Sequence, residues 1–298
     1  MNYRLSSAFR FLAIPLATLL LAGCGGSDAD GGSDGGGSGG APETAGHAGR
    51  SAGTAGSGGD SASVGGNDGV GNPGGSYRGP SVRSAKSFAA LAYSAITTAN
   101  ISSVTGDVGV SAGAMSTITG FDAPTDVKYG TDSLAPHEQR TILAQQDVTA
   151  LVGDIDPRAC DADYTDVVGG LTGDVTLYPG VTCMNSFSAD VLLNGHLTLD
   201  AKGDPNAFFI IRGNLTLTVA DAAQVVLANG AQACGVFWRI KKQVTIGKTV
   251  AFYGTVIAGT AITLSTESTL SGRALAQTAG VVLDANTVAI PSSCSHLE

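Results

Sequence analysis

The chain has few charged, aromatic and imidazole side chains. Among its 298 residues, charged side chains account for 14% and aromatic side chains for 6%, with one Trp and four His. The 16 Lys and Arg residues form no long basic stripe, and the formal net charge is −9. Because a nucleic-acid ligand needs a basic surface to neutralise its phosphates, we expect no nucleic-acid partner.

The sequence also lacks clear catalytic and metal-binding signatures. Neither His137 nor His196 lies near a nucleophile motif, and the five Cys residues contain no C-x-x-C pair. The acid-rich segment 154–166 lacks the ligand order of an EF-hand. The aspartates that could pair as catalytic carboxylates adjoin a Gly or lie in a turn, where Asp is an ordinary turn former: Asp174, Asp200, Asp204 and Asp284. We therefore expect neither an enzyme nor a bound metal or cofactor.

The N-terminal residues predict an export signal. Arg4 and Arg10 provide positive charge, and the apolar run 11–21 is too short to span a bilayer. The ending 21–24 (LAGC) resembles a bacterial lipobox, which implies cleavage before Cys24 and lipidation of its thiol. We predict that residues 1–23 are a lipoprotein signal peptide and that the protein is an exported lipoprotein of the outer membrane or cell surface. The alternative is an ordinary secretory signal followed by a coincidental Cys.

A flexible tether is expected between the signal and the folded part. Residues 24–80 consist mainly of Gly, Ser, Ala and Asp, with almost no aliphatic or aromatic side chains. Such a segment cannot bury enough apolar surface to offset the entropy of ordering it. The remaining residues, 81–298, are sufficient for one domain with a sizeable core.

The four Cys residues of the domain indicate disulfides, because their number is even and the protein is exported. Our preferred pairs are Cys160–Cys183 and Cys234–Cys294. The second pair would hold the C-terminal tail against the fold. The spacing alone permits three pairings.

Short apolar triplets centred mostly on Thr repeat through the C-terminal half of the chain. Several lie about 18–22 residues apart, the length of one coil of a β-solenoid. In a strand, the outer aliphatic residues of a triplet point inward and the central residue points outward. The triplets are 175–177 (VTL), 197–199 (LTL), 215–217 (LTL), 244–246 (VTI), 262–264 (ITL) and 281–283 (VVL). We expect a mainly β solenoid, with Trp238 in its core.

One helix interrupts this pattern. Residues 136–152 contain Pro only at the first position and no Gly, and Gly153 follows as an expected stop signal. The apolar stripe has helical spacing and comprises Ala144, Val148, Leu151, Val152 and Ile155. We expect this helix to lie along the solenoid and to bury that stripe.

Four ordered motifs resemble the microbial ice-binding protein family (DUF3494). They are 104–110 (VTGDVGV), 197–210 (LTLDAKGDPNAFFI), 226–238 (VLANGAQACGVFW) and 270–276 (LSGRALA). The resemblance covers about residues 84–294. It implies a discontinuous right-handed β-solenoid of triangular section, with one long α-helix packed alongside. It also implies non-enzymatic binding to ice through one flat face.

The candidate ice-binding residues are outward Thr side chains. Thr combines a hydroxyl with a methyl group, and its β-branch restricts χ1. The segment 260–263 (TAIT) matches a pattern of the family's ice-binding members. The main candidates are Thr245, Thr249, Thr255, Thr260, Thr263, Thr266 and Thr269, with Thr198, Thr216 and Thr218 from earlier coils. The predicted partner is therefore an ice surface. The alternative is a surface adhesin or structural lipoprotein that uses the same fold to bind an extracellular glycan or another cell.

Overall fold

The computed structural model describes residues 79–121, 127–134, 137–164, 170–184 and 190–292. All of them belong to one compact unit, residues 66–298. The predicted signal peptide, Cys24, nearly all of the predicted tether and Cys294 lie outside the described residues. The predicted domain boundaries stay predictions.

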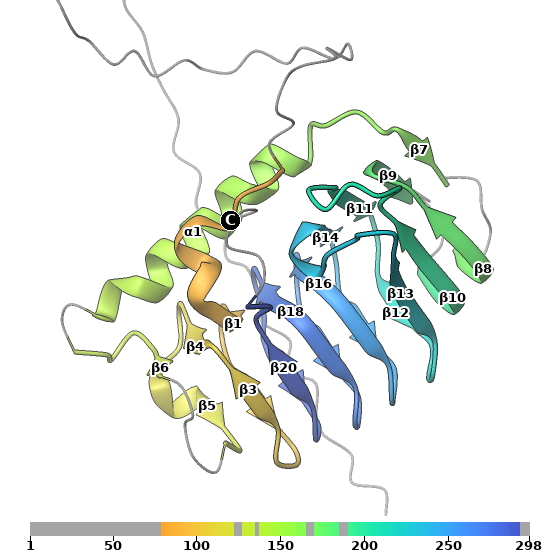
Figure 1. Cartoon of the computed structure of the whole chain (residues 1–298). Coiled ribbons are helices and arrows are strands. Elements are labelled where there is room, and N and C mark those ends of the chain that lie inside the picture. Colours follow the sequence, from red (N-terminus) through yellow and green to blue (C-terminus); the bar gives the residue numbers. More distant parts are fainter. Residues whose placement is uncertain (1–78, 122–126, 135–136, 165–169, 185–189, 293–298) are drawn as a thin grey trace, which may run out of the picture. The chain divides into compact units, whose positions relative to one another are not determined.

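The described part of the chain is mainly β and forms two large parallel sheets (Figure 1). The strands of the first sheet, in spatial order, are β6 (Lys128–Tyr129), β4 (Asp107–Val110), β1 (Phe88–Ala92), β18 (Thr269–Ala276), β16 (Ala251–Ala258), β14 (Val236–Ile240), β11 (Phe209–Gly213), β9 (Gly180–Met184) and β7 (Ala162–Asp163). Two more strands continue from β18 in this sheet, β20 (Thr287–Ala289) and then β3 (Ser103–Thr105).

The second sheet runs beside the first. Its strands, in spatial order, are β13 (Gln224–Ala228), β10 (Val191–Asp200), β12 (Leu217–Val219), β15 (Val244–Ile246), β17 (Ile262–Leu264), β19 (Val281–Leu283), β2 (Ile96–Thr98) and β5 (Ile118–Thr119), with β8 (Leu171–Leu177) paired to β10. Successive segments of the chain alternate between the sheets, so each circuit forms one coil. This arrangement confirms the predicted β-solenoid.

The solenoid is discontinuous in sequence. The N-terminal strands β1, β2 and β3 pair with β18, β19 and β20 near the C-terminus. Figure 1 shows the orange and yellow N-terminal strands beside the dark blue C-terminal ones. The last coil in the sequence therefore lies in the middle of the stack. Its strand β18 pairs with β1, which precedes the helix in the sequence, and with β16, which follows it.

Helix α1 (Arg140–Ile155) lies along the outer side of the first sheet (Figure 1). At 1.5 Å per residue its 16 residues span about 24 Å, roughly five coil spacings. Ala144, Val148, Leu151 and Ile155 are buried, and Val152 packs partly against the same cluster. The predicted helix and its stripe are confirmed. Short 3₁₀ helices also occur: η1 (Arg83–Ser87), η2 (Met115–Thr117), η3 (His137–Gln139) and η4 (Ala233–Gly235).

The end of α1 differs from the prediction. Gly153 lies inside the helix, which continues to Ile155, so the prediction that Gly153 stops it is wrong. Arg212 donates from Nη1 to the carbonyl of Ile155 at 3.2 Å and also to the carbonyl of Asp156. Because a guanidinium satisfies these terminal carbonyls, the helix needs no glycine turn to end.

The part of the first sheet that lies beneath α1 and η1 is buried on both sides. On β14, Trp238 points into the solenoid interior, while Phe237 points towards the helix. The indole nitrogen of Trp238 donates to the Tyr253 carbonyl at 2.9 Å, which confirms the prediction of a core Trp. The covered part of this sheet has no outer surface available for a ligand. Binding by a flat β face must therefore use another side of the solenoid.

A disulfide joins the segment after α1 to β9. It links Cys160 to Cys183, the first of the preferred pairs. Arg212 donates from Nη2 to both sulfur atoms, at 3.2 and 2.9 Å. Cys234 is also disulfide-bonded. Its predicted partner Cys294 lies outside the described residues.

Candidate functional site

One uncovered side of the solenoid carries a continuous column of small β-branched side chains. It is the outer side of strands β12, β15, β17, β19, β2 and β5. In the three-residue strands β12, β15, β17 and β19, the two outer residues are buried and the central one is at least partly exposed. The central positions stand in lateral register from coil to coil. We call them the Thr column: Thr218, Thr245, Thr263, Val282, Thr97 and Thr119.

The geometry of the Thr column follows from the pairing. Adjacent parallel strands lie about 4.8 Å apart, so the column places one β-branched side chain at each such interval. χ1 of Thr and Val is restricted, and the buried neighbours on either side hold the backbone in place. Consequently the methyl and hydroxyl groups form a pre-organised row.

Small residues occupy many of the positions that flank the Thr column. Two positions before the central residues stand Ala261, Gly280 and Ala95. Two positions after them stand Gly247 and Ser265. In an extended strand these positions point to the same side as the column. Larger side chains occur at three equivalent positions, Gln243 before Thr245, Asp284 after Val282 and Phe121 after Thr119.

Charged residues occupy the turns at the ends of these strands. Lys241 and Lys242 precede β15, and Lys248 follows it, all three exposed. Glu267 lies in the turn before β18 and is exposed. Asp284 follows β19 by one residue and is half-buried. The column itself is uncharged.

The structure divides the predicted Thr candidates among several places. Thr245 and Thr263 belong to the Thr column. Thr249 and Thr266 lie in turns after β15 and β17, and Thr260 lies in the turn before β17. The set is therefore not a single plane.

Two main candidates lie away from this side altogether. Thr269 begins β18 and aligns with Thr287 and Ser103. We call this exposed side, which is neither covered by α1 nor part of the Thr column, the third side of the solenoid. Thr255 is only 1% exposed, so the prediction that it faces outward is wrong. It stands between Phe237 and Arg273 on the outer side of the first sheet. That side is covered by α1 and η1.

The candidates from earlier coils separate in the same way. Thr218 belongs to the Thr column, whereas Thr198 pairs with Val226 on the third side. Thr216 lies before β12, in which Leu217 and Val219 are buried and Thr218 is partly exposed. The predicted triplet 215–217 is therefore wrong by two residues.

Sequence reasoning missed Thr97 and Thr119. Both sit in short N-terminal strands, and Thr97 reaches the column only through the pairing of β2 with β19. Its flanking residues Ile96 and Thr98 form a weaker apolar triplet than those of the later coils. The available signal was the dipeptide Ile-Thr, which occurs at 96–97 and again at 118–119.

The third side is more mixed in composition. Its row of aligned residues runs through Ala251, Thr269, Thr287 and Ser103, so that hydroxyl groups occupy three of its four positions. The neighbouring strand β13 pairs with β10 of the other sheet. On β10, His196 Nδ1 lies 2.8 Å from Asp174 Oδ1, and both side chains are exposed. This exposed ionisable pair has no counterpart among the side chains of the Thr column.

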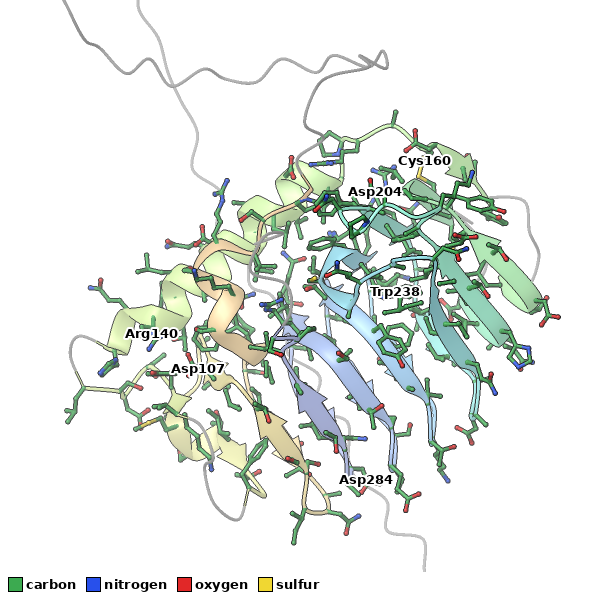
Figure 2. The ribbon with its side chains drawn as sticks, in the orientation of Figure 1. Asp107, Arg140, Cys160, Asp204, Trp238 and Asp284 are labelled. Atoms are coloured by element: carbon green, nitrogen blue, oxygen red, sulfur yellow. A yellow bond between two sulfur atoms is a disulfide. The ribbon has the colours of Figure 1, made fainter. Side chains whose placement is uncertain are left out.

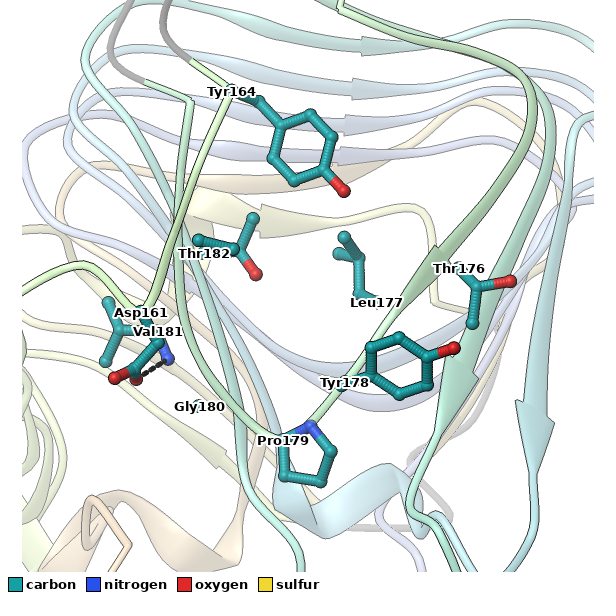
Figure 3. Close-up of a pocket in the computed structure, with 10 residues that line it drawn as sticks. Asp161, Tyr164, Thr176, Leu177, Tyr178, Pro179, Gly180, Val181 and Thr182 are labelled. Carbon is teal, nitrogen blue, oxygen red and sulfur yellow. Dashed lines mark hydrogen bonds between the residues drawn. The ribbon is translucent and has the colours of Figure 1, made fainter. Parts of the chain in front are cut away.

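A pocket of about 190 Å³ opens between β7, β8 and β9 at one end of the solenoid (Figure 3). Tyr164, Leu177 and Thr182 line it together with Tyr178. The carboxylate of Asp161 accepts a hydrogen bond from the Val181 amide at 2.8 Å and so has a structural role. The residues that line this pocket include no His, Cys, Ser or Lys.

The remaining aspartates from the sequence analysis serve turns. Asp200 Oδ1 accepts hydrogen bonds from the Lys202 amide and from Asn229 Nδ2, both at 2.8 Å. These bonds keep the pKa of Asp200 below its ordinary value, the Asn229 bond contributing most. Asp204 accepts from the Asn206 amide at 2.8 Å. Within the described ranges, no three His, Cys, Asp or Glu side chains converge as metal ligands, and no helix is long and apolar enough to cross a membrane.

Known proteins are similar to this chain in sequence and in fold. Residues 90–289 match the family model described as ice-binding-like. The ice-binding protein of Nostoc sp. (strain HG1) is 38% identical over 205 residues, which cover 68% of this chain and 71% of the relative. The ice-binding protein of Flavobacterium frigoris (strain PS1) is 32% identical over 219 residues, with coverages of 70% and 75%.

Solved structures agree with the sequence comparison. The crystal structure of an ice binding protein from an Antarctic biological consortium has a TM-score of 0.65 at 31% identity, covering 74% of this chain and 94% of that one. An ice-binding protein from an Arctic yeast has a TM-score of 0.66 at 29% identity, with coverages of 72% and 94%. From its coils, its helix and these similarities, the chain belongs to the ice-binding-like family.

Proposed function

We propose that this domain binds ice through the Thr column and adsorbs to the crystal without chemical catalysis. The observation that carries the proposal is the lateral register of Thr218, Thr245, Thr263 and Thr97 on one uncovered side. Relatives at 30–38% identity are named ice-binding proteins, which supports the same ligand here.

The physical basis is the match between a rigid surface and an ordered solid. Threonine hydroxyls at regular intervals can hold water molecules in fixed positions, while the methyl groups exclude others. Each contact is weak, so their sum is useful only if little entropy is lost on binding. Paired strands with restricted rotamers meet that requirement. Adsorbed protein would then restrain growth of the crystal around it.

We further propose that the domain acts at the cell surface as a tethered ice-binding lipoprotein. The support is the sequence ending at Cys24 and the Gly- and Ser-rich segment that follows it. A lipid at one end and an ice-binding domain at the other would favour adhesion to ice over free diffusion. Metabolic labelling with a radioactive fatty acid tests the anchor. Label on the wild type that disappears in Cys24→Ala supports it, and an unlabelled wild type contradicts it.

Substitution of Thr263 tests the ice-binding face. Thr263→Tyr places a bulky ring in the middle of the Thr column and should reduce thermal hysteresis about tenfold or more, because the flat contact is lost. The matched control is Thr269→Tyr, the same change at an exposed strand position on the third side. We expect the control to retain activity, with circular dichroism unchanged for both. Full activity of a folded Thr263→Tyr protein would contradict this face.

A further inference from the structure

The Thr column is assembled from two separate parts of the chain. Thr218, Thr245, Thr263 and Val282 come from successive C-terminal coils. Thr97 comes from the N-terminal part and joins them through the three-residue pairing of β19 with β2. Elsewhere in the column, neighbouring coils are directly connected by the chain. At this joint the paired strands are about 185 residues apart in sequence, so non-covalent contacts alone must set the register.

A carboxylate spans the joint at the edge of the Thr column. Asp284 Oδ2 accepts a hydrogen bond from Thr266 Oγ1 of the preceding coil at 2.5 Å. Its Oδ1 accepts a hydrogen bond from Asn100 Nδ2 of the N-terminal part. Figure 2 shows Asp284 near the end of the strands that lies away from the helix. One side chain thereby connects three neighbouring turns.

A second set of bonds lies beneath this bridge. Asn286 is buried, and its Nδ2 donates to the carbonyl of Ser265 at 2.7 Å and to the carbonyl of Ser268 at 3.1 Å. Its backbone amide donates to Ser102 Oγ at 3.0 Å. These buried bonds satisfy the backbone of the turns and therefore maintain the fold. The half-buried Asp284 bridge is additional to them, so it is not needed to satisfy buried groups.

We propose that Asp284 is a positioning residue for ice recognition, because it holds the N-terminal coils in register with the C-terminal ones and so makes the Thr column continuous. The inference rests on the proposed function. It assigns the inner bonds of Asn286 to folding and the outer bridge of Asp284 to alignment of the binding surface.

The electrostatics of the bridge agree with this role. The pKa of Asp284 lies below its ordinary value, first because of the Thr266 hydrogen bond, then the Asn100 bond, with a smaller contribution from the positive charge of Lys248. Glu267 is the acidic residue of the facing turn, and its amide donates to the Asp284 carbonyl at 3.2 Å. The charged carboxylate with both bonds therefore persists until the pH falls below the ordinary Asp range, and it is lost as the pH falls through the lowered pKa.

Three variants of the full chain test the inference. Asp284→Ala removes both bonds and should lower thermal hysteresis about threefold, because a misaligned column loses part of its pre-organised contact. Asp284→Asn keeps the shape but loses the charge and leaves one acceptor oxygen for two donors, so its hysteresis should lie between that of Asp284→Ala and that of the wild type. The matched control is Asp200→Ala, which removes a similar aspartate bridge, to Asn229, far from the joint. We expect the control to keep wild-type activity.

The pH profile separates alignment from general stability. As the pH falls below the ordinary Asp range and through the lowered pKa of Asp284, the hysteresis of the wild type should fall to the level of Asp284→Asn, which shows no such step, with both proteins still folded by circular dichroism. Equal activity of Asp284→Ala and wild type, or the same acid step in Asp284→Asn, would overturn the inference. An inactive wild type would instead refute the proposed function itself.

Discussion

Single side chains determine how flat the Thr column is and how regularly it presents hydroxyl groups. Val282 occupies the position where the neighbouring coils have Thr263 and Thr97, and it is 42% exposed. Val and Thr have nearly the same shape, so the surface stays flat at this point. One hydroxyl is missing, however, at the centre of an otherwise regular row.

Restoring that hydroxyl provides the first prediction at this scale. Val282→Thr should raise thermal hysteresis by up to about twofold, with the free energy of unfolding unchanged within about 0.5 kcal/mol because the site is on the surface. The matched control is Val226→Thr, at a 41% exposed Val on β13 outside the column. We expect the control to leave hysteresis unchanged. A fall in hysteresis for Val282→Thr would mean that the apolar surface at this position contributes more than the hydroxyl row.

At the scale of the elements, glycines have opposite roles in the helix and at the solenoid corners. Gly153 lies inside α1, and a Cβ there would have no neighbour within 4 Å. Gly272 stands beside Gly254 at a corner of the first sheet, and a Cβ there would lie 1.9 Å from the Gly254 carbonyl oxygen. Helical glycine is replaceable, whereas the corner needs the close approach of two backbones.

Two alanine substitutions test this contrast. Gly153→Ala should increase the free energy of unfolding by about 0.5–1 kcal/mol, since it reduces the entropy of the unfolded chain and favours the helix. Gly272→Ala should decrease it by more than about 2 kcal/mol, because a backbone clash cannot relax without moving a coil. Urea denaturation followed by circular dichroism measures both. A destabilised Gly153→Ala protein would argue against a continuous helix through this position.

At the scale of the whole molecule, the disulfide and the proposed ice-binding column lie in different regions. The Cys160–Cys183 disulfide lies in the coil at one end of the stack, where β7 and β9 pair. It links this end coil to the segment that follows α1. The middle of the Thr column lies several strands away, at β15, β17 and β19. A change confined to the end coil should therefore alter stability more than binding.

Removing the disulfide tests this separation. The double variant Cys160→Ser/Cys183→Ser opens a loop with a sequence separation of 23 residues. It should lower the free energy of unfolding by about 3 kcal/mol through the entropy of the unfolded chain. Thermal hysteresis near 0 °C should stay close to that of the wild type, since the folded protein keeps the column. Loss of hysteresis in a folded double variant would show that the end coil belongs to the binding surface.

Local patterns in the sequence determined the parts of this protein that depend on near neighbours in the chain. The alternation of apolar and polar residues predicted that Thr245 and Thr263 point outward, since side chains alternate along a strand. The helical spacing of Ala144, Val148 and Ile155 predicted the buried stripe of α1, although the contact from Arg212 extended that helix beyond Gly153.

Only the tertiary structure decided which outward residues share a surface. Alternation distinguishes the two sides of a strand but does not show whether another element covers the outer side, which is why Thr255 is buried beneath the α1 and η1 cover. Thr97 entered the column through a pairing between distant segments, β2 and β19. Such pairing depends on contacts across the whole domain, so local sequence determined the coils while long-range packing determined the face.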